Sequence, residues 1–142
     1  MDTNIWLDVA LNRAAAAGSA AFLRLCTARQ DDLWIAWHTI ANTDYILKRA
    51  KVSAPDRELH LRGILSQARI VPTDESDALR ALDRRWNDYE DALQAAAAER
   101  CRADCIITGN SADFSASSIP ALSPDDYIAA HTKIRSTDQQ QG

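Results

Sequence analysis

The sequence lacks the long apolar runs that mark membrane and secreted proteins. No apolar run approaches the ~20 residues that a membrane-spanning helix needs. The first residues also lack the basic-then-apolar pattern of a signal peptide. We therefore expect no membrane partner and take a cytoplasmic location as the default.

Cysteine and positive charge are both scarce. The three cysteines, Cys26, Cys101 and Cys105, are odd in number and lack the spacing of a zinc site, so we expect buried small hydrophobic residues. The 16 Lys and Arg stand against 20 Asp and Glu, for a formal net charge of −4. This balance argues against binding of nucleic acid by bulk electrostatics, but it permits a nuclease with a local basic rim.

The composition that remains is that of one globular domain. The chain has 142 residues, of which 46% are hydrophobic and 25% are charged, and it contains no internal repeat. We expect residues 1–134 to form a single domain. Residues 135–142 are polar, with a Gln run and no apolar anchor, which predicts a disordered tail.

Helical and strand-like segments alternate in the first half of the chain. Residues 14–29 and 39–51 have apolar positions at helical spacing. Between them, residues 33–37 form an apolar, aromatic run, which predicts a buried strand with its two tryptophans in the core rather than on a base-stacking surface. A capped helix then restarts at residue 53, so residues 39–67 are expected to form a helical hairpin that projects as an arm.

The second half continues the alternation. A helix that opens at residues 73–75 has Leu79, Leu82 and Trp86 at a spacing that predicts burial. Asp88 is expected to cap the following helix, and residues 105–107 predict a strand. Strands separated by helices predict an α/β protein, with three α/β/α layers around a mostly parallel central sheet.

Two carboxylates in this second half suggest a metal site. Asp91 lies at the start of the helix before the strand, and Asp113 lies in the polar loop after it. A helix–strand–loop unit can bring both to one edge of a parallel sheet, where converging carboxylates suit a hard cation. Each residue alone also has an ordinary interpretation, since Asp is favoured in the first turn of a helix and in loops.

Four short segments, in order, resemble the PIN-domain nucleases and, within them, the VapC-like toxin branch. They are residues 2–4, 39–47, 91–100 and 108–114. Residues 119–127 are similar to the closing strand and helix of that family. The resemblance covers nearly the whole chain and implies the three-layer α/β/α fold already predicted.

The resemblance also implies a set of site residues. Carried over by position, Asp2, Asp91 and Asp113 are the ligands of Mg²⁺ or Mn²⁺, and Asn42 completes the catalytic group in place of the Glu that most of the family carries. The supporting residues are Asn4, Thr108 and Asn110. One branch of the family has Asn in a similar Thr-x-x-Asn setting. Asp44 cannot replace the missing carboxylate, because it points roughly 200° away from Asn42 around the helix.

The function implied is a metal-dependent endoribonuclease that hydrolyses RNA phosphodiester bonds, as the toxin of a type II toxin–antitoxin system. Its expected partners are RNA, a cognate antitoxin protein and a second copy of the chain, which is expected to bind through the 39–67 arm together with the 14–29 helix.

An alternative is a PIN-fold module that binds RNA or protein with a weakened or inactive metal site. Asn42 favours this alternative, as does the single residue before Asp2 where related domains have most of a strand. A plain α/β interaction module is a third interpretation, which requires the ordered motifs to be coincidence.

Two further features have both a structural and a functional interpretation. His38 is expected to pack at the end of a strand rather than to act as a base. Lys48, Arg49 and Lys51 lie at the end of the 39–51 helix, where complementarity to the helix dipole explains them and phosphate contact is the lesser interpretation.

Overall fold

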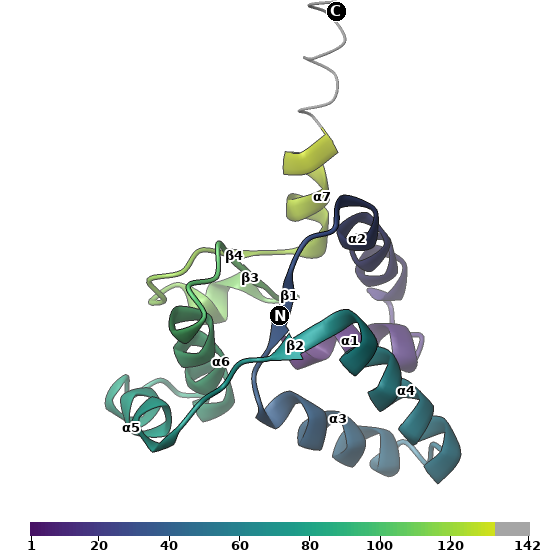
Figure 1. The fold of residues 1–142 in the computed structure, drawn as a ribbon, viewed down its shortest axis with the longest axis horizontal. Helices are drawn as coiled ribbons and strands as arrows, with labels where there is room; N and C mark the ends of the chain where they lie inside the picture. Colours follow the sequence, from purple (N-terminus) through teal and green to yellow (C-terminus); the bar gives the residue numbers. More distant parts are fainter. Residues whose placement is uncertain (133–142) are drawn as a thin grey trace, which may run out of the picture.

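The computed structural model describes residues 1–132, so the tail predicted at 135–142 lies outside the described residues. No helix in the described part is long and apolar enough to cross a membrane. The elements, shown in Figure 1, are α1 (Thr3–Ala10), α2 (Ala16–Arg29), β1 (Leu33–Ile35), α3 (His38–Arg49), α4 (Ala54–Gln67), β2 (Ala68–Ile70), α5 (Glu75–Asp83), α6 (Tyr89–Arg100), β3 (Ile106–Ile107), the 3-10 helix η1 (Ser111–Phe114), β4 (Ala121–Leu122) and α7 (Pro124–Thr132).

The strands form two parallel pairs, which the first two residues join. β1 pairs with β2, and β3 pairs with β4. Between the pairs, the Met1 backbone nitrogen donates to the Trp34 carbonyl at 2.9 Å, and the Asp2 backbone nitrogen donates to the Ile107 carbonyl at 2.8 Å. The α/β fold with parallel strands is confirmed, and the expected first strand is reduced to this two-residue bridge.

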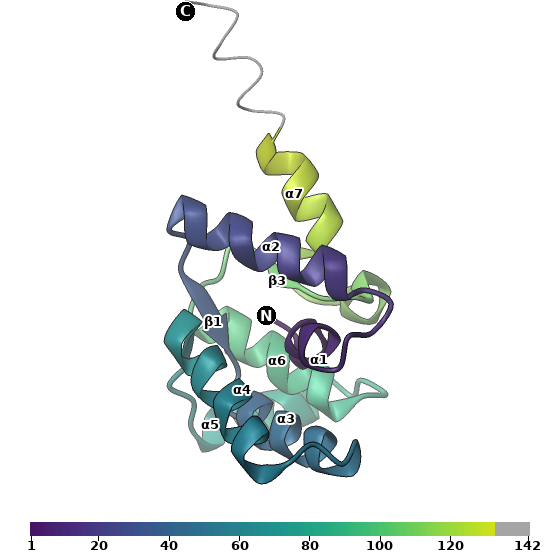
Figure 2. The same ribbon diagram turned by 90° about the vertical axis from the view of Figure 1, so that its right-hand side faces the viewer.

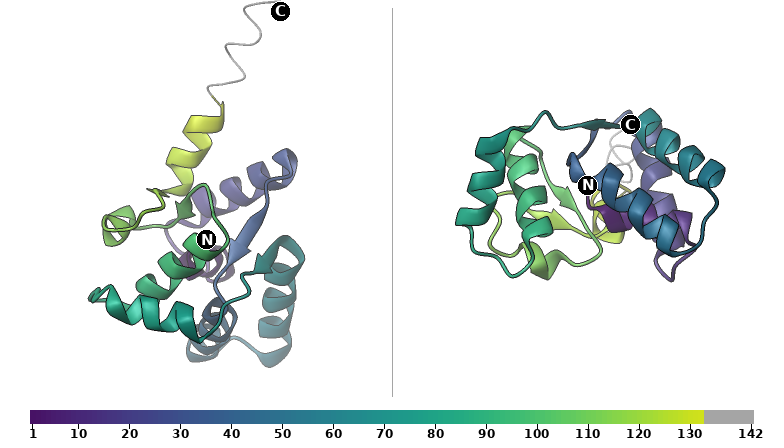
Figure 3. Two further views of the ribbon diagram at one scale, coloured as in Figure 1. Left: turned by 60° about the vertical axis from the view of Figure 1, so that its left-hand side comes forward. Right: turned by 90° about the horizontal axis from the view of Figure 1, so that it is seen from below.

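Helices cover both faces of the strands. Successive strand residues point to opposite faces, so Ile107 packs with α1 and α2 whereas Ile106 packs with α6. Helix α7 packs on α2, and α5 covers α6 from outside (Figures 2 and 3). Ala95, Ala96 and Ala97 are at most 2% exposed, because small side chains let α6 lie close to the strands. The expected arm is formed by α3 and α4, which pack on each other while α3 also packs on α1.

The strand predicted at 33–37 ends at Ile35, and Trp37 is not in the core. Trp37 already has helical backbone angles, and the Thr39 nitrogen donates to the Ala36 carbonyl at 3.1 Å as α3 begins. This turn leaves Trp37 68% exposed. The prediction of a buried tryptophan was therefore wrong for Trp37, whereas Trp34 is half-buried beneath the Arg69 guanidinium.

The buried face of α5 also differs from the prediction. Leu79 and Leu82 are 54% and 58% exposed, whereas Asp77 and Ala81 face inward at 2% and 1%. The apolar spacing was outweighed because two arginines hold the Asp77 carboxylate between α5 and α6. The cysteine prediction holds for Cys26, which is buried, but Cys101 and Cys105 are only half-buried.

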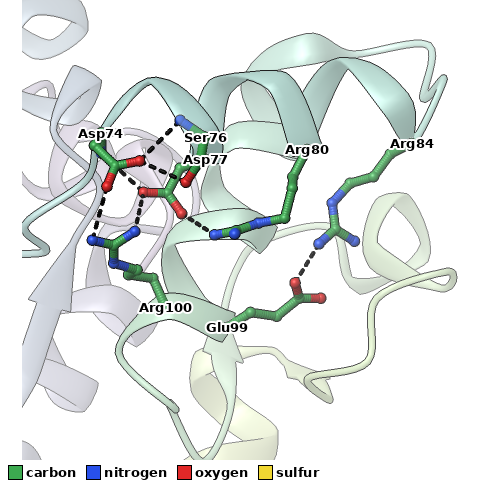
Figure 4. Close-up of polar contacts among 7 residues, drawn as sticks. All are labelled: Asp74, Ser76, Asp77, Arg80, Arg84, Glu99 and Arg100. Carbon is green, nitrogen blue, oxygen red and sulfur yellow. Dashed lines mark hydrogen bonds and ion pairs between the residues drawn. The ribbon is translucent and has the colours of Figure 1, made fainter.

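Ion pairs fix α5 against α6 (Figure 4). Arg100 donates to Asp77 at 3.0 Å and to Asp74 at 3.1 Å, and Arg80 also donates to Asp77. Asp74 and Asp77 form a capping box at the start of α5, and the bonds from Ser76 and Arg100 lower the pKa of Asp74 to about 2. Arg84 of the next turn pairs with Glu99. The network holds the helix that brings Asp91 to the sheet.

We predict that Arg100→Gln lowers the free energy of unfolding by about 1 to 3 kcal/mol, because the buried Asp77 carboxylate loses a charged partner. Urea unfolding followed by circular dichroism measures the change. The matched control is Arg62→Gln, whose pair with Glu58 is exposed on α4 and contributes at most about 0.5 kcal/mol. Equal effects of the two substitutions would show that the network adds nothing beyond a surface pair.

Candidate functional site

The Asp2 carboxylate is the fixed point of the site. It is 6% exposed. Its Oδ2 accepts from the Thr108 hydroxyl at 2.8 Å, and its Oδ1 accepts from Gln94 Nε2 at 3.1 Å and from the Asn4 backbone nitrogen at 3.2 Å. The end of β3, helix α6 and the start of α1 therefore meet on one side chain, which also caps α1.

Asp91 lies beside Asp2 in the first turn of α6. Asp88 caps this helix, as predicted, by accepting from the backbone nitrogens of Glu90 and Asp91. Partial burial and then the negative charges of Asp88, Asp2, Asp113 and Glu90, in that order, together raise the pKa of Asp91 to about 6. Five carboxylates are thus close enough to repel one another. They are called the carboxylate group below and belong to Asp2, Asp88, Glu90, Asp91 and Asp113.

Asp113 joins this group from the loop after β3. The Asn110 side-chain nitrogen donates to Asp113 Oδ2 at 2.7 Å, and the Asn110 backbone nitrogen donates to the Thr108 hydroxyl at 3.1 Å. Since the same hydroxyl donates to Asp2, a chain of hydrogen bonds runs from Asp113 to Asp2. An open depression of about 440 Å³ lies between the loop and α6, lined by Trp86, Asn87, Asp88, Asp91, Asp113 and Ala116.

Two residues that were not predicted for the site lie at its other side. Glu90 Oε1 accepts from the Thr3 hydroxyl at 3.3 Å and lies 3.9 Å from His38 Nε2. Burial lowers the pKa of His38 despite the opposing charges of Glu90, Asp2 and Asp88. The sequence signal for Glu90 was its place beside Asp91, and that for His38 was its position four residues before Asn42 on one helix face.

Asn42 itself is less closely engaged than the carboxylates. It is half-buried in the second turn of α3, one turn beyond His38, and within residues 1–132 no hydrogen bond joins it to Asp2, Asp91 or Asp113. Asp44 faces elsewhere, since its carboxylate accepts from Arg57 of α4 at 2.9 Å. Asn4 accepts from Arg13 at 3.1 Å at the rim of the site.

The chemistry of these side chains fits a hard divalent cation. Mg²⁺ prefers carboxylate and amide oxygens and retains several waters. Gln94 Oε1 is a buried acceptor beside Asp2 that has no partner in the described part of the chain. As the side chains stand, no three His, Cys, Asp or Glu among residues 1–132 converge to direct metal-binding distance. The residue types therefore fit such an ion. The ion would contact few of these side chains directly and would bind the others through water.

A comparison with protein families supplies the identity of the fold. A family model described as PIN domain matches residues 1–112. Searches of curated proteins and of solved structures returned no match. PIN domains are in general nucleases, and they typically use divalent metal ions. Because the match covers most of the chain, including Asp2, Asn42 and Asp91, this protein belongs to the PIN-domain family.

Proposed function

We propose that this protein is an endoribonuclease that uses Mg²⁺ or Mn²⁺, and that it is the toxin of a VapC-like toxin–antitoxin pair in the cytoplasm. The observation that carries the proposal is the carboxylate group around Asp91, where partial burial and neighbouring charge raise the pKa to about 6. Such a group is costly in the free protein, and a bound cation would offset the repulsion.

Each residue of the group has a distinct role in the proposal. Asp2, Asp91 and Asp113 would hold the metal ion, and Asn42 would offer a neutral carbonyl oxygen. A divalent ion at such a site supplies a nucleophilic water near neutral pH and offsets charge on phosphoryl oxygens.

The chain's other polar groups orient these ligands. Thr108 and Gln94 hold the Asp2 carboxylate in one orientation, and Asn110 does the same for Asp113. The reaction adds water oxygen to phosphorus and breaks the P–O3′ bond, which leaves 5′-phosphate and 3′-hydroxyl ends.

A second candidate function is a PIN-fold module that binds RNA or protein without cutting. Two observations favour it: Asn42 adds no negative charge, and the described carboxylates do not form a closed metal site. Cleavage tested with Mg²⁺ or Mn²⁺, and again with a chelator, separates the two candidates.

Protein partners belong to the same proposal. Leu59 and Leu65 of α4 are 69% and 49% exposed, which leaves apolar area on the arm that an antitoxin or a second copy could cover. We assign the homodimer contact to the side of α4 that carries Leu59 rather than to α3.

We predict that Asp91→Asn and Asp113→Asn each lower metal-dependent RNA cleavage by about a hundred-fold or more, because each removes a negative ligand whose effect amounts to several kcal/mol. A gel assay with labelled RNA measures the loss, and circular dichroism checks the fold. Asp104→Asn is the matched control, since Asp104 is exposed before β3. Wild-type activity in a folded Asp91→Asn variant would contradict the assignment.

The Asp91→Asn variant has a second readout that does not depend on activity. A pKa raised from 3.8 to about 6 means that the folded state favours the protonated carboxyl. This contribution to stability is present below pH 3.8 and is lost as the pH rises through about 6. Urea unfolding with a chelator should therefore show Asp91→Asn to be more stable than wild type at pH 7, with the difference vanishing in acid.

We predict that Asn42→Glu tightens Mg²⁺ binding and raises cleavage at limiting Mg²⁺, because affinity for hard cations rises with ligand charge. Asp44→Asn should leave metal affinity unchanged, since Asp44 pairs with Arg57, and should cost at most about 1 kcal/mol of stability. Isothermal titration calorimetry measures the Mg²⁺ affinity of the wild type and of both variants. Loss of metal binding in Asp44→Asn alone would mean that Asp44, not Asn42, belongs to the site.

We also predict a homodimer at tens of micromolar, an order of magnitude typical of ordinary interfaces. Multi-angle light scattering measures its mass. Leu59→Glu should give a monomer, because a charge would then be buried in the contact, and Glu58→Gln on the same helix is the control. A monomeric wild type would rule out the proposed contact.

A further inference from the structure

We propose that the exposed face of α3 is a track for single-stranded RNA, in which unpaired bases stack on Trp37 and Tyr45 and phosphates meet Lys48 and Arg49. The inference rests on the proposed ribonuclease function, because it names how the substrate of the same site is held. It concerns residues outside the carboxylate group.

The four side chains share one face of the helix. At 100° per residue, positions 37, 41, 45 and 48 or 49 fall on one side. Trp37 and Tyr45 are 68% and 58% exposed, whereas Thr39, Thr43 and Leu47 on the opposite side are fully buried. Ala41 lies between the two rings, so no large side chain separates them. Figure 1 shows α3 along the lower edge of the molecule.

One end of this face adjoins the carboxylate group. Trp37 immediately precedes His38, whose Nε2 lies 3.9 Å from Glu90 Oε1 in the first turn of α6. A strand with its scissile phosphate near Asp91 can therefore place a neighbouring nucleotide at Trp37.

Trp37 differs from the other tryptophans in having no partner in the described part of the chain. Trp6 is 5% exposed, Trp34 lies under Arg69, and Trp86 packs edge-on against Phe114. An exposed indole ring that packs on no neighbouring side chain is available to stack on an unpaired base. Tyr45 differs in a complementary way, because the Arg49 guanidinium lies 5.8 Å from its ring centre and 3.4 Å from its hydroxyl. An aromatic ring beside a cation suits a base and its phosphate together.

The charge of the protein favours stacking over a purely ionic contact. The net charge is −4, and the carboxylate group repels an incoming phosphate in the absence of metal. Base stacking on aromatic rings is independent of this charge, and it requires bases that are not already paired. Two aromatic rings and two cations on one helix face therefore predict a preference for single-stranded over duplex RNA.

The test measures RNA affinity by fluorescence anisotropy, with Ca²⁺ in place of Mg²⁺ and a gel to confirm that the RNA stays intact. The probe is a labelled single-stranded RNA of mixed sequence, compared with its duplex. We expect Trp37→Ala and Tyr45→Ala each to weaken single-strand binding about five-fold or more, with Trp37→Phe retaining most of the affinity. Arg49→Gln should reduce the dependence of binding on salt.

Leu82→Ala is the matched control, because Leu82 is as exposed as Tyr45 and lies on α5, away from both helices of the arm. Three outcomes would each overturn the track. They are unchanged affinity in both alanine variants, equal losses of affinity for single-stranded and duplex RNA, and a wild type that binds no RNA. So would a change of oligomeric state in Trp37→Ala, since α3 would then face a second copy. RNA that binds through α3 and is not cut by Mg²⁺-loaded protein would overturn the nuclease but support the track.

Discussion

Two backbone hydrogen bonds link the two strand pairs of this protein. The Met1 nitrogen bonds to β1 and the Asp2 nitrogen bonds to β3, so residues 1 and 2 bridge the two pairs. The same geometry fixes the Asp2 side chain, which must lie where the strands end and where α6 and α1 approach. The position of the candidate site thus follows directly from this bridge between the strand pairs.

The protein treats its buried or partly buried carboxylates in two ways. Asp77 is 2% exposed but lies between Arg80 and Arg100, so its charge is balanced within the fold. Asp91 is surrounded instead by carboxylates, and its pKa is raised. Charges that serve only the fold are paired with arginine. Charges left without a cationic partner are the expected signature of a functional site.

Local signals in the sequence predicted much of the fold. Asp88 was identified as a cap, and residues 105–107 as a strand, because capping and β-propensity act within a few residues. Trp37 and the leucines of α5 were misplaced, because an apolar residue does not reveal which face its neighbours cover. For α5, the ion pairs of Asp77 with a helix over twenty residues away decided the orientation.

The residues of the candidate site could be predicted from the sequence only in part. Asp91 and Asp113 could be placed together from their helix–strand–loop unit, whereas Asp2, Asn4, Thr108 and Asn110 were implied by the resemblance to the family. Glu90 and His38 could not, because their contact depends on the angle between α3 and α6, which the sequence does not encode locally. Asn42 remains a prediction, since its place on α3 is clear but its link to the carboxylates is not direct.

The hydrogen bond from Thr108 to Asp2 joins residues 106 positions apart in the chain. Contacts of such separation form late, because a long loop must close before they can stabilise anything. Asp2, Asp91 and Asp113 come from three segments that are far apart in the chain. The carboxylate group is therefore complete only once β3 and the loop that follows it have folded against the start of α1.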